Sequence, residues 1–162
     1  MSVFGLVFFV EMTVVLGAIA WQDYSRLKIP NELTLLTLGV VITFWACGTI
    51  PIGVLDIGFA LALFVMSIMF WLAGKVGAGD VKLLGVVALP VGIAGGMPFA
   101  ISLCALAFTT AGSYRWIMMF GYRYPRLWRW VELAERKQVP YGVLISLATL
   151  VSLLARFRSS LY

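Results

Sequence analysis

The chain has 162 residues, of which 62% are apolar and 12% charged, with a net charge of +5; soluble domains average about 45–50% apolar and about 25% charged residues. One core cannot hide this excess, because a soluble domain of about 150 residues leaves nearly a third of its unfolded surface exposed, so a soluble globular protein is excluded. The chain has only two Cys, which excludes a disulfide framework and a Cys-rich metal domain. It has no His, so the usual base, nucleophile activator and zinc ligand at neutral pH is missing.

The long uncharged stretches predict an all-α, polytopic membrane protein, because about 20 residues at 1.5 Å each cross the ~30 Å core of a bilayer. The first stretch contains Glu11 as its only charge, and it lacks the basic start and small-residue cleavage site of a removable signal peptide. Gly and Pro interrupt the longer stretches at residues 48–53 and 90–98. We therefore expect one membrane domain over residues 1–162, with six spans at about 2–21, 33–49, 53–74, 81–96, 98–114 and 140–156.

The basic residues predict the orientation of these spans. The loops at 22–32, 75–82 and 113–139 fall on one side and contain every Lys and Arg except Arg156 and Arg158. Because cytoplasmic loops carry the excess of basic residues, this side is expected in the cytoplasm, and the net positive charge does not indicate nucleic-acid binding. The two C-terminal arginines disagree with this orientation, and a five-span or re-entrant ending would relocate them.

The 113–139 loop alternates basic and aromatic residues. Such segments occur in RNA-binding proteins and in helices that lie in the lipid headgroup layer. Its place between two spans favours an interfacial cytoplasmic segment at about 115–139. Glu132 and Arg136, four residues apart, support a helical turn within it.

Two carboxylates are the candidate catalytic residues. Asp23 follows the first span and Asp80 precedes the fourth, so both are expected at the same membrane face. Two adjacent carboxylates share a proton, so one can take a proton from water while the other polarises a peptide carbonyl, as in aspartic proteases. Gly77 and Gly79 permit positive φ and close approach of a substrate backbone. Each aspartate alone also fits an ordinary helix cap or turn.

Three motifs resemble those of the type IV prepilin peptidase family, the bacterial branch of the GxGD intramembrane aspartic proteases. They are residues 77–83 (GAGDVKL), Asp23 with residues 29–31 (IPN), and residues 139–142 (VPYG). The length and layout of the chain are similar to those of the short family members that serve tight-adherence (Flp-type) pili.

The resemblance implies an endopeptidase of the bacterial inner membrane that removes the basic leader from type IV or Flp prepilins or pseudopilins at the cytoplasmic face. The substrate continues into an N-terminal hydrophobic helix. Asp23 and Asp80 would be catalytic, and the other candidates for shaping the loop or contacting substrate are Gly77, Gly79, Lys82, Pro140, Tyr141 and Gly142. Larger relatives also methylate the new N-terminus and carry a zinc domain, but the loop at 22–32 has no Cys. No metal or cofactor is therefore expected, and methylation and oligomeric state stay open.

Two other functions fit parts of the sequence. Membrane carboxylates also serve proton relays, so a small proton-coupled transporter is one alternative. A non-catalytic subunit of pilus assembly is the other. Glu11 lies mid-span and fits a proton relay or a structural role, but about 18 Å of helix separates it from Asp23. Asp56 is expected at the membrane interface, and Cys47 and Cys104 are expected to pack among apolar side chains.

Overall fold

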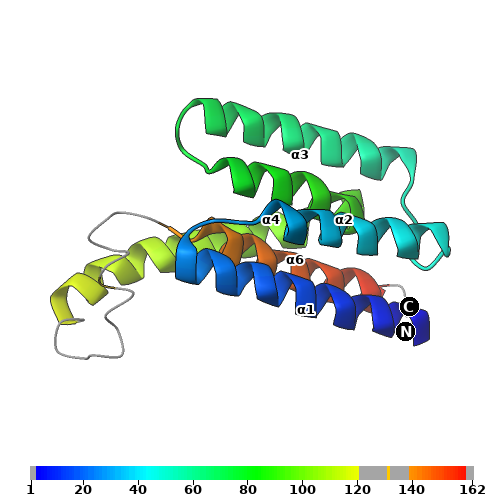
Figure 1. The fold of residues 1–162 in the computed structure, drawn as a ribbon, viewed down its shortest axis with the longest axis horizontal. Coiled ribbons are helices and arrows are strands. Elements are labelled where there is room, and N and C mark those ends of the chain that lie inside the picture. The colour runs from blue at the N-terminus through cyan, green and yellow to red at the C-terminus, as the bar shows by residue number, and fades with distance from the viewer. Residues whose placement is uncertain (1–2, 121–130, 132–138, 160–162) are drawn as a thin grey trace.

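The computed structural model describes residues 3–120, 131 and 139–159, and this part of the chain is helical without strands. The helices are α1 (Val3–Arg26), α2 (Asn31–Ala46), α3 (Val54–Leu72), α4 (Ala78–Phe120) and α6 (Tyr141–Ser159) (Figure 1). Within the described residues, the stretches long and apolar enough to cross a membrane are Val3–Arg26, Val54–Leu72 and Ala78–Tyr114, while α2 and α6 contain shorter apolar helices. The predicted all-α, polytopic membrane fold is confirmed.

Gly92 divides α4 into two helical halves, residues 78–91 and 93–120, which run in opposite directions (Figure 1). Its φ of 60° and ψ of −179° fall in a region that is essentially restricted to glycine, because any Cβ would clash there. The sequence predicted the boundary between the fourth and fifth spans at residues 96–98, beside Pro98. The structure places the turn earlier, since glycine supplies the reversed φ, and Pro98 lies inside the second half.

Arg156 of α6 binds carbonyl groups at this end of the bundle. Its Nη1 donates a hydrogen bond of 2.6 Å to the carbonyl of Pro90, and its Nη2 donates one of 2.7 Å to the carbonyl of Pro51. Asp56 accepts a 2.9 Å hydrogen bond from the N–H of Ile93 and lies 4.0 Å from Nη2 of Arg156. Helix ends leave such backbone groups without helical partners. Arg156 therefore has a structural role at this end of the bundle, which accounts for one of the two basic residues that disagreed with the predicted orientation.

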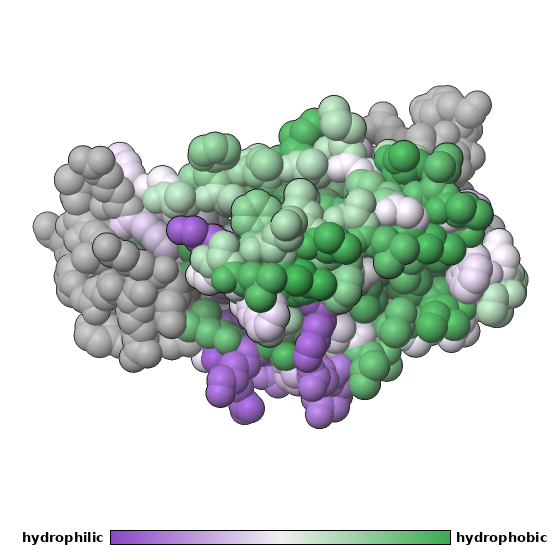
Figure 2. Space-filling model, turned by 90° about the horizontal axis from the view of Figure 1, so that it is seen from above, coloured by the Kyte–Doolittle hydropathy of each residue, from purple (hydrophilic) through white to green (hydrophobic). Residues whose placement is uncertain are grey.

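The core of the bundle forms around α6, which packs against both α1 and α4. Phe8, Met12, Leu16 and Ile19 of α1 are fully buried and recur every three or four residues, so they lie on one face of the helix. By contrast, α3 exposes many large apolar side chains, and Figure 2 shows a broad hydrophobic surface on that side of the molecule. A surface of this kind is suited to contact with lipid.

The predicted interfacial segment at about 115–139 is described only in part. The helix α4 continues through Phe120, so the first residues of this segment are helical. Residues 121–130 and 132–138, including the predicted pair of Glu132 and Arg136, lie outside the described residues. The last helix, α6, covers most of the span predicted at 140–156, and the side chain of Arg158 also lies outside the described part of the chain.

Candidate active site

Asp23 lies in the last turn of α1, and only 5% of its surface is exposed. Its Oδ2 accepts a hydrogen bond of 2.7 Å from the backbone N–H of Gly142, in the first turn of α6. The N-terminus of a helix has unpaired N–H groups and a partial positive charge. The start of α6 therefore holds this carboxyl group in place and stabilises negative charge on it.

Asp80 lies in the first turn of α4, and 8% of its surface is exposed. Its Oδ2 accepts a hydrogen bond of 3.2 Å from the backbone N–H of Gly77, just before the helix. A side chain that reaches back to an N–H at the start of its own helix is half of a capping box. Asp80 therefore has the helix-cap role that the sequence also allowed, and this hydrogen bond fixes the direction of its side chain.

The structure brings Asp23 and Asp80 together, because both line the same two adjoining cavities, of about 390 Å³ and about 330 Å³. We call these two cavities the aspartate cleft. Leu27 and Gly77 also line both of them. The first cavity extends towards the turn between α3 and α4 and the start of α6, and the second extends towards the turn between α1 and α2. A peptide segment in the cleft can therefore pass both carboxyl groups.

The surroundings of the two carboxyl groups favour chemistry by the pair. Two buried acidic groups in one cleft disfavour the state in which both are ionised. Neither forms an ion pair with another of the described residues, although Lys75 lines the first cavity and Lys28 the second. The described residues also contain no group of three or more His, Cys, Asp or Glu side chains placed to hold a metal. The cleft can thus hold one ionised and one protonated carboxyl group beside a water molecule.

The lack of a side chain at Gly142 and Gly77 leaves room for the carboxyl groups of Asp23 and Asp80. A Cβ on Gly142 would lie 2.9 Å from Oδ2 of Asp23, and a Cβ on Gly77 would lie 3.0 Å from Oδ2 of Asp80. Real Cβ atoms rarely approach other atoms so closely, because such distances are inside van der Waals contact. Larger residues at these two positions would therefore displace the carboxyl groups.

The loop before α4 differs from the sequence-based expectation in its backbone. Gly77 and Gly79 were expected to permit positive φ, but neither adopts it, whereas Gly74 does, with a φ of 69°. A Cβ on Gly79 would lie 3.1 Å from the Cβ of Ile29. The lack of a side chain at Gly79 therefore allows the loop to pack against the α1–α2 turn, which closes one side of the cleft.

Most of the remaining candidates from the sequence do not line the cleft. Tyr141 lines its first cavity, and Pro140 is buried immediately before α6. Lys82 does not line the cleft, and its Nζ donates a 3.0 Å hydrogen bond to Oδ1 of Asn31. Glu11 is exposed on α1 and lines neither cavity. Of these residues, only Tyr141 lines the aspartate cleft.

Leu27 is a lining residue that sequence reasoning missed. Its N–H donates a 2.8 Å hydrogen bond to the carbonyl of Asp23, and its φ of 52° is left-handed. This conformation ends α1 and directs the chain around the cleft. No sequence signal indicates it, because Gly and Asn are the usual residues at such positions and a leucine there is rare.

Comparison with known proteins identifies the family. A model of the type IV leader peptidase family matches residues 10–113. The matched region contains Asp23, Asp80 and the glycines between α3 and α4, and it ends before Gly142. No curated protein and no solved structure matches the chain. Because the match covers more than half of the 162 residues and both carboxyl groups of the cleft, the chain belongs to the type IV leader peptidase family.

Proposed function

We propose that this protein is a prepilin peptidase, an aspartic endopeptidase that removes the basic leader from type IV or Flp prepilins or pseudopilins. Asp23 and Asp80 are its catalytic residues. The supporting observation is that these two buried carboxyl groups, from α1 and α4, line one cleft. Membership of a leader peptidase family supports peptide-bond hydrolysis, and the matched residues include both aspartates.

The first step uses a water molecule between the two carboxyl groups. Asp23 is the base, because the N–H of Gly142 stabilises its negative charge. It takes a proton from the water as the water oxygen attacks the scissile carbonyl carbon. Asp80, in its protonated form, donates its proton to the carbonyl oxygen. The product is a neutral tetrahedral diol, with Asp23 protonated and Asp80 ionised.

The second step breaks the C–N bond and restores both residues. Asp23 gives its proton to the leaving amine, while Asp80 takes a proton from one hydroxyl of the diol as the carbonyl forms again. The net reaction adds one water molecule across the peptide bond. It requires no His and no metal, in accordance with a chain that contains no His.

The position of the cleft supports cleavage at the cytoplasmic membrane face. Lys28 and Lys75 line the cleft, and basic residues favour the cytoplasmic side of a membrane protein. The first half of α4, residues 78–91, begins at the cleft with Asp80 in its first turn, and it is about 21 Å long at 1.5 Å per residue, shorter than the ~30 Å hydrocarbon core. The cleft therefore lies slightly below the membrane surface, where a substrate helix must unwind locally to expose its bond.

Incubation of the purified protein with a Flp prepilin, followed by mass measurement of both fragments, tests this function. Wild-type protein is expected to release the leader, and Asp23→Asn and Asp80→Asn are each expected to lower the rate by at least about a thousandfold. Glu11→Gln is the matched control, because this exposed carboxyl group of α1 lies outside the cleft. Cleavage at the wild-type rate by either Asp variant would reject the catalytic pair. The fragment masses also show whether the new N-terminus is methylated.

A further inference from the structure

A separate, larger cavity, of about 580 Å³, adjoins the aspartate cleft on the side of α3 and α6. Its walls are mostly apolar and come mainly from α3, the second half of α4 and α6. We call it the α3–α4–α6 groove, and the residues that define it here are Leu63, Met66, Phe70, Leu103, Cys104 and Ile145. Met66, Phe70 and Cys104 are exposed, so the groove opens to the apolar outer surface of the bundle.

The groove is continuous with the aspartate cleft. Lys75, Val76 and Tyr141 line both the groove and the first cavity of the cleft. Ser67 is a buried polar residue of the groove, and its hydroxyl donates a 2.7 Å hydrogen bond to the carbonyl of Phe64. This hydroxyl therefore needs no partner from a ligand, and the groove is suited to an apolar occupant that ends at a polar mouth.

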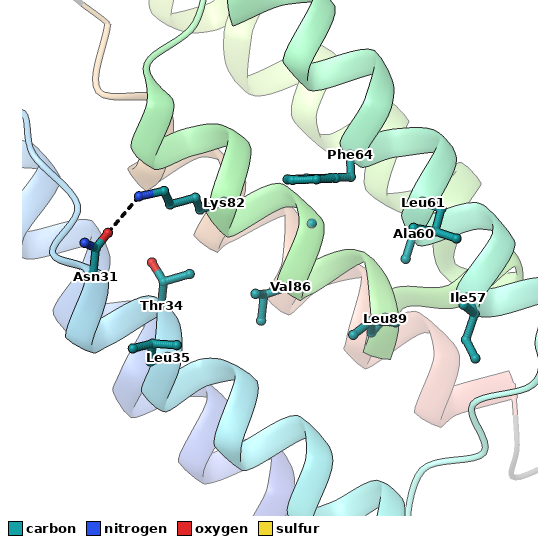
Figure 3. Close-up of a pocket in the computed structure, with 11 residues that line it drawn as sticks. Asn31, Thr34, Leu35, Ile57, Ala60, Leu61, Phe64, Lys82, Val86 and Leu89 are labelled. Atoms are coloured by element: carbon teal, nitrogen blue, oxygen red, sulfur yellow. Dashed lines mark hydrogen bonds between the residues drawn. The ribbon is translucent and has the colours of Figure 1, made fainter.

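Another apolar cavity, of about 570 Å³, lies between α2, α3 and the first half of α4 (Figure 3). It has no lining residue in common with the aspartate cleft. At its end nearest the cleft, the hydrogen bond between Lys82 and Asn31 joins α4 to α2 (Figure 3). Ile29, which lines the second cavity of the cleft, packs against Gly79 and does not line this apolar cavity. The cavity of Figure 3 is similar in size to the α3–α4–α6 groove but is not continuous with the cleft. It therefore serves as a control site for experiments on the groove.

We propose that the α3–α4–α6 groove binds the hydrophobic helix of the substrate, the segment that directly follows the scissile bond. This inference rests on the proposed function. A prepilin places a polar leader directly before an apolar helix, and the protein places a polar cleft directly beside an apolar groove. With the helix in the groove, the chain passes Lys75 and Tyr141, reaches the two aspartates, and continues as leader into the second cavity beside Lys28.

The two native cysteines supply a direct test by cross-linking. Cys104 lines the groove, whereas Cys47 is exposed beyond the end of α2. In proteoliposomes, Asp80→Asn protein keeps the substrate uncut, and Cys47→Ser or Cys104→Ser leaves a single thiol. A Flp prepilin with one Cys at successive positions of its hydrophobic helix is then treated with a short bismaleimide. Cross-links are expected only from Cys104, at substrate positions that recur about every three to four residues.

A groove-filling variant gives an independent readout in the active enzyme. Leu103→Trp is expected to lower kcat/KM for the prepilin by at least about tenfold, mainly through KM, because an overpacked groove excludes the helix. Leu35→Trp, in the cavity of Figure 3, is the matched control and is expected to retain wild-type kinetics.

The other outcomes separate the competing explanations. Cross-links from a Leu35→Cys variant in place of Cys104 would overturn the proposal and put the substrate helix in the cavity of Figure 3. Absence of cross-links together with unchanged kinetics of Leu103→Trp would leave lipid as the occupant of the groove and would also overturn it. In both cases wild-type cleavage of the prepilin would persist, whereas a wild-type protein that cuts no prepilin would reject the proposed function and this inference together.

Discussion

The backbone N–H of Gly142 donates a 2.7 Å hydrogen bond to Oδ2 of Asp23. This contact joins the end of α1 to the start of α6, across most of the length of the chain. It places one carboxyl group of the aspartate cleft at the positive end of a helix that the family match does not cover. The last helix is therefore a part of the candidate active site and not only a membrane anchor.

Gly142→Ala is expected to reduce prepilin cleavage without unfolding the protein. The added Cβ would lie 2.9 Å from the Asp23 carboxyl oxygen, and a displacement of about 1 Å in a catalytic group lowers the rate by up to about a hundredfold. The measurement is kcat/KM beside thermal unfolding in detergent. Gly17→Ala in α1 is the control, because no atom lies within 4 Å of its Cβ position. Wild-type kcat/KM for Gly142→Ala would show that this close contact has no catalytic role.

The cleavage rate is expected to depend on pH as a bell-shaped curve. The mechanism needs one ionised and one protonated carboxyl group. At low pH both groups are protonated and the base is lost, whereas at high pH both are ionised and the proton donor is lost. The measurement is kcat/KM for the prepilin between about pH 4 and pH 9. A rate that is constant over this range would contradict catalysis by a carboxyl pair.

Gly92→Ala is expected to destabilise the protein. Its combination of φ and ψ costs a residue with a Cβ about 1–3 kcal/mol, and that Cβ would also contact Asp56. For a chain of this size, such a loss lowers Tm by about 2–12 °C. Gly58→Ala is the control, because no atom lies within 4 Å of its Cβ position in α3 and alanine favours the helix. An unchanged Tm for Gly92→Ala would mean that the turn between the halves of α4 adopts another conformation.

Arg156→Gln is expected to lower stability but to preserve catalysis in the folded fraction. The change removes charged hydrogen bonds to the carbonyl groups of Pro90 and Pro51, and each such bond contributes about 1.5–3 kcal/mol. The site lies at the end of the bundle opposite the aspartate cleft. Thermal unfolding and kcat/KM are measured together, and Arg156→Lys is expected to recover only part of the stability, because lysine lacks the planar fork of donors. A fall in kcat/KM per folded molecule would show that the two ends of the bundle are coupled.

Lys82→Met is expected to cleave prepilin within about twofold of the wild-type rate, as is usual for an exposed side chain outside a site. Although Lys82 is close to Asp80 in sequence, its ammonium group binds Asn31 and it does not line the cleft. Asn31→Ala removes the same hydrogen bond from the other side and is expected to behave alike. A tenfold lower cleavage rate in Lys82→Met, with a wild-type rate in Asn31→Ala, would show that the charge of Lys82 acts on the substrate or on the carboxyl pair.

Several features of the fold and of the site were predictable because they depend on local composition. Hydropathy determined that the chain is helical and crosses a membrane, since the bilayer constrains each apolar stretch separately. Counting spans predicted Asp23 and Asp80 at one face, and the structure places both side chains in one cleft. The GxGD motif indicated the family that the comparison then identified.

Other features depend on which helices meet, and this information is absent from any single stretch of sequence. Gly92 and Pro98 are both residues that interrupt helices, and the structure places the turn at Gly92, where Asp56 of α3 and Arg156 of α6 bind the backbone around residues 90–93. The bond from Gly142 to Asp23 and the continuity of the α3–α4–α6 groove with the cleft likewise depend on tertiary packing. The sequence thus determined a membrane protein with an aspartate pair at one face. Only the tertiary structure decided how the pair is held and what adjoins it, because those contacts join residues from separate helices.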